Sequence, residues 1–255
     1  MLWAIDVGNT QTVVGIHDGE KWRAQWRLQS DRERTEDELI ATLRTLCDHA
    51  GLAFVAEGMV VCSVVPNIDI VWERFAARGL NVAARFLRNG AQVGVQVDYN
   101  PPHAVGADRI ANALAAWDRY GTACIVVDFG TATTFDTVDH RGHYVGGAIQ
   151  PGPMVALESL AGRTAKLPLF ALETPRTAIG TDTVSSLQSG FMFGYAGAID
   201  AVARRIKAEL QGPVKVISTG GLGGLFLPLC EEIEANEPLL TLDGLRLAWD
   251  RALRV

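Results

Sequence analysis

The sequence predicts an α/β protein built from two equivalent half-domains that face one ligand across a central cleft. The first observation is a repeated turn, in which an apolar strand ends in Asp and continues into a Gly-Thr or Gly-Asn-Thr turn. The two copies are Ile5-Asp6-Val7-Gly8-Asn9-Thr10 and Val127-Asp128-Phe129-Gly130-Thr131-Ala132. The second observation is that strand-like segments surround both copies in the same order and spacing. This doubling favours one shared anionic ligand, for which phosphate is the natural candidate.

Composition narrows the class of protein. The chain has 255 residues, 48% of them hydrophobic, so it can form one large domain or two ordinary ones. Its 23 basic and 29 acidic residues give a net charge of −6 without a Lys/Arg cluster, so no nucleic-acid partner is expected. No apolar run could span a bilayer and no basic leader is present, so we expect a cytoplasmic protein without a membrane partner. The spacing of the cysteines indicates reduced core thiols: Cys47, Cys62, Cys124 and Cys230.

Residues 1–119 form the first predicted half, which begins as an antiparallel meander. Thr35-Glu36-Asp37-Glu38 has the pattern of a capping box and opens a helix that extends toward Gly51. Asn100-Pro101-Pro102 breaks the chain before a helix that starts at Gly106-Ala107-Asp108-Arg109. The strands expected in this half are 2–7, 12–17, 21–28, 58–65, 82–86 and 93–99, and a further helix is expected over 68–78.

Residues 120–255 form the second predicted half, which restarts the same pattern. A long connection from Leu167 to Thr181 is typical of a functional segment or of one packed on a partner. Small residues crowd the helix expected over 183–210, and packing inside the chain or against a second subunit both remain open. The strands expected here are 123–128, 134–139, 144–149 and 214–218, with helices after Pro153, from about Leu222 and over 244–254.

The turn after Asp6 has the residue types of a phosphate-binding loop. Gly8 allows backbone N–H groups to approach phosphate oxygens closely, and Asn9, Thr10 and Thr12 add neutral donors. The Asp6 carboxylate would repel a bare phosphate, so its position implies Mg²⁺ bound together with a nucleotide. Taken alone, this copy could also be an ordinary tight turn with an Asx hydrogen bond.

The second copy repeats this chemistry. Thr131 and Thr133 could donate to phosphates, and Asp128 offers a second place for a cation. A third glycine-rich turn, Ser218-Thr219-Gly220-Gly221-Leu222-Gly223-Gly224, follows a strand and suits the close approach of an adenine or a ribose. Its spacing differs from the Gly-x-x-x-x-Gly-Lys-Ser/Thr phosphate loop, so it is informative only beside the other two turns.

Asp108 is the expected catalytic residue. A carboxylate in the first turn of a helix is stabilised in its ionised form, in which it can orient a substrate hydroxyl and accept its proton. Arg109 offers a planar fork for a carboxylate or a phosphate. The alternative is an Asp that merely favours a helix N-terminus beside a paired surface Arg. The histidines show no catalytic or metal-ligand pattern.

A set of motifs, in order along nearly the whole chain, resembles the type III pantothenate kinase family. That family lies within the wider superfamily of acetate kinases, sugar kinases, Hsp70 and actin. The motifs are Asp6-x-Gly8-Asn9-Thr10, Tyr99-Asn100-Pro101, Gly106-Ala107-Asp108-Arg109, Val127-Asp128-Phe129-Gly130-Thr131-Ala132-Thr133, Gly146-Gly147-Ala148-Ile149 with Pro151-Gly152, Thr164-Ala165-Lys166-Leu167-Pro168 and Thr219-Gly220-Gly221.

The resemblance implies two ribonuclease H-like half-domains, the duplication found in actin-like ATPases. It also implies ATP-dependent phosphorylation of pantothenate to 4'-phosphopantothenate, the first step of coenzyme A biosynthesis, by a homodimer. One alternative is another small-molecule kinase of the superfamily that acts on a sugar or a carboxylic acid. A second alternative is a non-catalytic accessory or regulatory protein with the same fold.

The resemblance also implies roles for individual residues. Asp108 would be the proton acceptor, Asp128 would bind a monovalent cation, K⁺ or NH₄⁺, and Asp6 would meet Mg²⁺ through the nucleotide. The residues that would hold ATP are Asp6, Val7, Gly8, Asn9, Thr10, Gln11, Thr12, Val13 and Thr131. The residues that would hold pantothenate are Tyr99, Gly106, Ala107, Asp108, Arg109 and Thr183.

Overall fold

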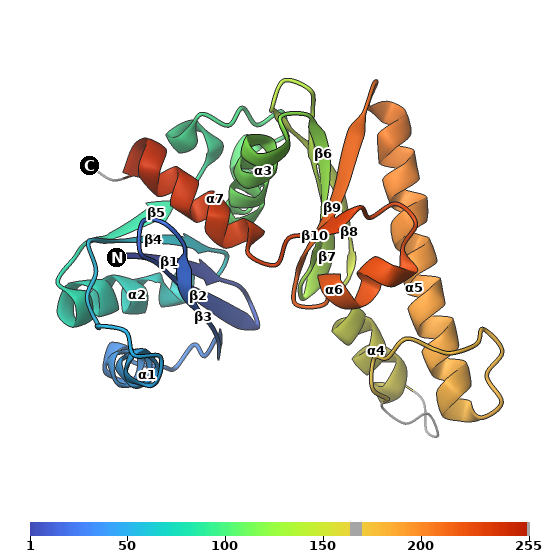
Figure 1. Ribbon diagram of the computed structural model, residues 1–255, viewed down its shortest axis with the longest axis horizontal. Helices are drawn as coiled ribbons and strands as arrows, with labels where there is room; N and C mark the ends of the chain where they lie inside the picture. The colour runs from blue at the N-terminus through green and yellow to red at the C-terminus, as the bar shows by residue number, and fades with distance from the viewer. Residues whose placement is uncertain (164–169, 254–255) are drawn as a thin grey trace. The chain divides into compact units, whose positions relative to one another are not determined.

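The computed structural model describes residues 1–163 and 170–253 and contains two five-stranded sheets of the same strand order (Figure 1). The order is β3-β2-β1-β4-β5 in one sheet and β8-β7-β6-β9-β10 in the other. In each sheet, the first three strands form an antiparallel meander. Two further strands extend the sheet from the first strand of the meander and run parallel to it. The predicted α/β fold with a ribonuclease H-like duplication is therefore confirmed.

The chain divides into two compact units, one of Met1–Ala115 with Thr241–Val255 and one of Ala116–Leu240. The C-terminal residues therefore pack with the N-terminal sheet. The two halves predicted from the sequence repeat, 1–119 and 120–255, are defined by the order of their elements and not by compactness. This division of the chain stays a prediction.

The first sheet is built around a buried central strand, since Trp3, Ile5 and Val7 of β1 have no exposed surface. Its helices are α1 (Glu36–His49) and α2 (Asp69–Phe75), and the second continues into a π-helical turn, Ala76–Leu80. The predicted capping box is present, because the Thr35 hydroxyl accepts the Glu38 N–H and the Glu38 carboxylate accepts the Thr35 N–H. The strands of this sheet are β1 (Leu2–Val7), β2 (Gln11–His17), β3 (Trp22–Gln29), β4 (Gly58–Ser63) and β5 (Ala84–Leu87).

The strand predicted over 93–99 is wrong. Gly90–Val93 is a 3₁₀ turn that Asn89 caps with its side chain, and Gly94 follows with a φ of +73°. The side-chain cap and the left-handed glycine stop the extended backbone that a strand requires. The next regular helix is α3 (Ala107–Tyr120), which starts where the sequence predicts.

The second sheet packs against the long helix α5 (Thr183–Glu209), which buries Met192, Ala196, Ile199 and Ala203 along one face. Phe129 stacks on Phe226 in the same core, with ring centroids 5.1 Å apart. The other helices of this unit are α4 (Pro153–Gly162) and α6 (Gly223–Phe226). The strands are β6 (Ala123–Phe129), β7 (Ala132–Val138), β8 (Tyr144–Pro151), β9 (Val214–Gly220) and β10 (Ala235–Asn236).

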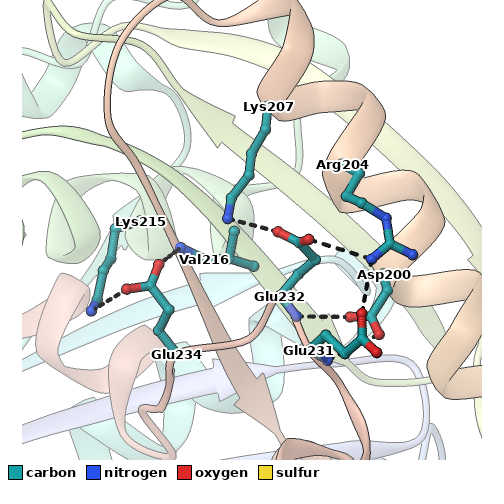
Figure 2. Close-up of polar contacts among 8 residues, drawn as sticks. All are labelled: Asp200, Arg204, Lys207, Lys215, Val216, Glu231, Glu232 and Glu234. Carbon is teal, nitrogen blue, oxygen red and sulfur yellow. Dashed lines mark hydrogen bonds and ion pairs between the residues drawn. The ribbon is translucent and has the colours of Figure 1, made fainter.

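Strand β10 is absent from the sequence analysis, and contacts with α5 anchor the loop that leads to it. The buried carboxylate of Asp200 accepts the N–H groups of Glu231 and Glu232, each at 3.0 Å (Figure 2). Arg204 and Lys207, further along α5, pair with the carboxylates of the same two glutamates (Figure 2). These contacts fix a two-residue strand that has too little length to show a sequence pattern.

The C-terminal helix α7 (Leu240–Ala248), continued by a π-helical turn over Trp249–Leu253, begins four residues before the predicted start at Gly244. A Cβ atom at Gly244 would lie 2.0 Å from the carbonyl oxygen of Ala111, so this glycine permits close packing on α3 inside the helix. The Thr164–Pro168 motif and the beginning of the connection from Leu167 lie outside the described residues.

Two further observations concern the cysteines and the helices. All four cysteines are free, and three of them are buried. Within the described ranges, no helix combines the length and the apolar character needed to cross a membrane.

Candidate active site

The turn between β1 and β2 presents polar side chains at the end of a buried strand. The Gly8 N–H donates to the Gln11 carbonyl oxygen at 3.0 Å, and a Cβ atom at Gly8 would lie 2.8 Å from that oxygen. The tight turn therefore requires glycine. Asn9, Thr10 and Gln11 are exposed, whereas Val7 is buried.

Thr12 supports this turn from within. Its side chain is buried, and its hydroxyl lies 2.8 Å from the hydroxyl of Ser30 at the end of β3. The Ser30 N–H in turn donates to the Thr10 carbonyl oxygen at 2.9 Å. Val13 is half-buried and lies opposite Asp6 in the β1–β2 register.

Asp6 lies beside a buried thiol. Its carboxylate accepts a hydrogen bond from Cys62 Sγ at 3.3 Å, across the parallel pair β1 and β4. Burial, followed by the negative charges of Asp6 and Asp108, raises the pKa of the Cys62 thiol well above its usual range. The thiol therefore stays protonated and serves as a donor to Asp6. A Cβ atom at Gly106 would lie 3.4 Å from Val64 Cγ1, just beyond the end of β4, so the beginning of α3 lies at this edge of the sheet.

Gly106 and Asp108 shape the first turn of α3. The Gly106 carbonyl oxygen accepts the Ile110 N–H at 3.2 Å, which opens the helix, and Asp108 Oδ1 accepts the Arg109 N–H at 2.8 Å. A Cβ atom at Gly106 would lie 2.4 Å from Asp108 Oδ1, so glycine leaves room for this carboxylate. Asp108 and Arg109 are half-buried, Ala107 is buried, and the partly exposed Tyr99 precedes the cis peptide bond between Asn100 and Pro101.

In the second unit, the turn after β6 has a similar polar edge. The Gly130 N–H donates to the Ala132 carbonyl oxygen at 3.1 Å, and Thr131 between them is exposed. Asp128, half-buried at the end of β6, lies against Gly220, where a Cβ atom would come within 2.6 Å of Asp128 Oδ1. Gly220 has a φ of +83°, so both its conformation and its neighbour favour glycine.

The expectation that Thr133 donates to a phosphate is wrong. Side chains alternate between the two faces of a strand, and Thr133 falls on the buried face of β7. Its hydroxyl lies 2.7 Å from the hydroxyl of Tyr195 on α5. Thr131, two residues earlier and outside the strand, keeps an exposed side chain.

Thr183 is exposed at the first position of α5, which Asp182 caps by accepting the Ser185 N–H at 2.9 Å. An open hollow of about 550 Å³ lies beside it, lined by Gly180, Thr181, Asp182, Thr183, Ser186 and Leu187. The third glycine-rich turn is packed tightly, since a Cβ atom at Gly223 would lie 2.4 Å from Asn236 Oδ1. The side chains packed against the backbone at this point therefore account for Gly223 without a ligand.

The structure thus gathers the predicted residues into two groups. In the first unit, Asp6 contacts Cys62 near the end of β1, the Gly8–Gln11 turn follows that strand, and Asp108 lies in the first turn of α3. In the second unit, Asp128 and Thr131 lie at the end of β6, and Thr183 lies at the beginning of α5. The contacts of Cys62 and Tyr195 could not be predicted from the sequence, because hydrogen bonds between distant strands and helices leave no local pattern.

The duplicated sheets, with an Asp-x-Gly turn at the end of each first strand, define a protein of the actin-like ATPase and sugar kinase fold. One similar solved structure, from Campylobacter jejuni, is described as a Baf family transcriptional activator; it has a TM-score of 0.62 and 16% identity, with 97% of both chains covered. Another is the activator of 2-hydroxyisocaproyl-CoA dehydratase from Clostridium difficile with bound ADPNP. Its TM-score is 0.54 and its identity 13%, with 98% of this chain and 94% of that chain covered.

Sequence comparisons narrow this class. Residues 2–205 match the model of the family "Type III pantothenate kinase". The chain is 40% identical over 252 residues, 98% of each chain, to the type III pantothenate kinase of Geobacillus thermodenitrificans (strain NG80-2). The chain therefore belongs to the type III pantothenate kinase family.

Proposed function

We propose that this chain is a kinase that transfers the γ-phosphoryl group of ATP to the primary hydroxyl of pantothenate, forming 4'-phosphopantothenate. This reaction is the first step of coenzyme A biosynthesis. The observation that carries the proposal is the family match over residues 2–205, together with 40% identity to a named pantothenate kinase along 98% of both chains. Phosphoryl transfer depends mainly on positioning and on neutralising charge, and polar backbone turns beside carboxylates suit both tasks.

The first turn is the proposed main contact with ATP. Gly8 lets the backbone approach a phosphate, and the exposed side chains of Asn9, Thr10 and Gln11 add donors. The turn is supported by strand residues on either side of it: Val7, Thr12 and Val13. In the second unit, Thr131 is the proposed contact with ATP. Asp6 fits Mg²⁺ bound through the nucleotide, since it offers a half-buried carboxylate oriented by the Cys62 thiol. When bound, the ion neutralises phosphate charge.

Asp108 is the proposed proton acceptor for the pantothenate hydroxyl. Its carboxylate is anchored through Oδ1 by the Arg109 N–H, which orients the group at the beginning of α3. Arg109 supplies a cation for the pantothenate carboxylate. Tyr99, Gly106, Ala107 and Thr183 complete the proposed set of substrate contacts.

Asp128 is the proposed ligand of a monovalent cation, K⁺ or NH₄⁺. The carboxylate lies against the Gly220 backbone, where carbonyl oxygens can help to coordinate a monovalent ion. Among the described residues, no group of three His, Cys, Asp or Glu side chains could hold a metal ion. We therefore propose that backbone oxygens bind the ion together with the Asp128 carboxylate.

A homodimer in the cytoplasm is the proposed state of the protein. Helices α4 and α5 leave large apolar side chains exposed, among them Met154, Val155, Val184 and Phe193. Space is open around Gly190, Gly194 and Gly197 of α5, which suits close approach of a second helix. Sedimentation should give the mass of a dimer, and a monomer at micromolar concentration would contradict this part of the proposal.

ADP release from ATP, with and without pantothenate, tests the proposed reaction. Pantothenate should stimulate ADP release strongly in K⁺ buffer and weakly in Na⁺ buffer. Stimulation by a sugar or another carboxylic acid, but not by pantothenate, would favour another kinase of the superfamily. Nucleotide binding without turnover on any acceptor would favour an accessory protein.

A further inference from the structure

A chain of hydrogen bonds connects helix α5 to the turn after β6. The Tyr195 hydroxyl donates to the Pro151 carbonyl oxygen at 2.7 Å and lies 2.7 Å from the Thr133 hydroxyl. Because the only proton of Tyr195 goes to Pro151, Thr133 must be the donor in the second bond. Burial raises the pKa of the Tyr195 phenol, so this proton stays in place at neutral pH.

The chain continues through a single peptide group. The Pro151 carbonyl and the Gly152 N–H belong to the same planar peptide, so fixing one end orients the other. The Gly152 N–H donates to the Thr131 carbonyl oxygen at 3.0 Å. The hydrogen-bonded chain therefore connects Thr133 in β7 with Thr131, two residues earlier in the sequence.

Both Gly152 and the ring of Tyr195 are closely packed. A Cβ atom at Gly152 would lie 2.3 Å from the Gly130 carbonyl oxygen and 2.5 Å from that of Thr131. The aromatic ring of Tyr195 is held by Phe191, with ring centroids 5.8 Å apart, and by Phe226, at 5.1 Å. A change confined to the hydroxyl would therefore leave the ring in place.

We propose that Tyr195 is a positioning residue for nucleotide binding, because its hydroxyl fixes the peptide between Pro151 and Gly152 and thereby the Gly130–Thr131 turn. This inference rests on the proposed function, since it takes that turn as a contact for the ATP phosphates. Tyr195 itself does not touch the nucleotide. Its effect reaches the site through backbone orientation, and it links the turn to the helix that carries the proposed dimer surface.

Tyr195→Phe is the direct test, because it removes the hydroxyl and retains the ring. Calorimetric titration with the Mg²⁺ complex of AMP-PNP should give a Kd about fivefold higher than that of the wild type, as expected for one lost hydrogen bond. The KM for ATP should rise in parallel, while the KM for pantothenate should stay within about twofold. A Kd for Mg²⁺-AMP-PNP equal to that of the wild type would overturn the inference.

Three further variants separate positioning from folding. Thr133→Val should raise the same Kd, because it removes the donor to Tyr195, while Thr133→Ser should restore it. Tyr144→Phe is the matched control, since it removes a tyrosine hydroxyl that donates to Asp136 at 3.2 Å, at the other end of the β7–β8 hairpin. It should lower Tm without changing the Kd. A rise in Kd equal to that of Tyr195→Phe would show a general effect of destabilisation and overturn the inference.

The wild type separates this inference from the proposed function. If it binds Mg²⁺-AMP-PNP but pantothenate does not stimulate turnover, the substrate assignment fails and the Tyr195 comparison still decides the inference. If the wild type binds no nucleotide, both fail.

Discussion

Asp6 and Asp128 occupy equivalent positions in the two sheets. Each is the penultimate residue of the first strand of its meander, Asp6 in β1 and Asp128 in β6. Their neighbours differ, because Asp6 lies beside Cys62 on the adjacent parallel strand and Asp128 lies beside Thr219. Asp6 receives a thiol hydrogen bond, whereas the Asp128 carboxylate lies against the backbone of Gly220. The same position in the fold therefore gives the two carboxylates different environments.

Asp128→Ala should weaken the response to K⁺ more than it affects folding. The substitution removes the one carboxylate proposed for the monovalent ion, and the partly exposed position tolerates a small side chain. Titration of turnover against K⁺ should show a half-maximal concentration raised about tenfold or more, which corresponds to loss of one charged ligand. A K⁺ titration identical to that of the wild type, in a variant with normal Tm, would remove Asp128 from this role.

Replacing Cys62 tests whether its thiol orients Asp6. Cys62→Ala removes the donor at 3.3 Å from the Asp6 carboxylate, so the KM for Mg²⁺-ATP should rise about three- to tenfold. Cys62→Ser supplies a hydroxyl donor at the same place and should stay nearer the wild type. Initial rates at varied Mg²⁺-ATP concentration measure both. If the alanine variant has the lower KM of the two, the hydrogen bond has no orienting function.

Asp200→Ala should destabilise the second unit strongly. The buried carboxylate accepts two backbone N–H groups, and its removal leaves both without that acceptor (Figure 2). We expect the free energy of unfolding in urea to fall by about 2–4 kcal/mol. Arg204→Ala is the matched control, because its ion pairs with Glu231 and Glu232 involve a largely exposed guanidinium and should contribute about 0–1 kcal/mol. Equal losses in the two variants would contradict the assignment.

His17 should make the first unit sensitive to mild acid. Burial, followed by the positive charge of Arg246, lowers the pKa of His17 below its ordinary value of 6.5. Its Nδ1 accepts the Gly19 N–H at 3.0 Å, a bond that requires an unprotonated Nδ1. Three carboxylates partly oppose this shift: Asp18, Asp250 and Asp243.

Because the pKa is lower in the folded state, the unfolded state takes up the proton first as the pH falls. The stability that His17 contributes is therefore complete above about pH 6.5 and is lost below it. Melting temperatures at about pH 7.5 and pH 5.5 should differ more for the wild type than for His17→Asn. The same difference in both proteins would show that other groups cause the acid sensitivity.

Much of the fold follows from local sequence patterns. The Asp-x-Gly turns, the Thr35 capping box and the hairpin strands depend on residues close in the chain, so they can be predicted. The strand predicted over 93–99 fails at its start, because Val93 ends the 3₁₀ turn Gly90–Val93 and Gly94 has a left-handed backbone conformation. The predicted start of the last helix at Gly244 is wrong for a different reason. Gly244 lies inside the helix because it packs closely on Ala111, which is distant in the sequence.

The candidate site shows the same limit. Residue types indicate Asp6, Asp108 and Asp128 as chemically important, because each follows a recognisable strand-turn or helix-start pattern. Side-chain direction is harder to predict: Thr133 has the residue type of a phosphate donor, yet the strand alternation directs it to Tyr195. Contacts between residues far apart in sequence, such as Cys62 with Asp6, depend on the register of strand pairing, which becomes visible only in the folded chain.

The transfer of phosphate to pantothenate can be measured directly by mass spectrometry of the products formed from ATP, Mg²⁺ and pantothenate in K⁺ buffer. The wild type should form 4'-phosphopantothenate and ADP in equal amounts. Asp108→Asn should form both about 100- to 10,000-fold more slowly, as expected for loss of a general base, with an unchanged Kd for Mg²⁺-AMP-PNP. ADP without phosphopantothenate, or a normal rate in Asp108→Asn, would contradict a pantothenate kinase that uses Asp108 as its proton acceptor.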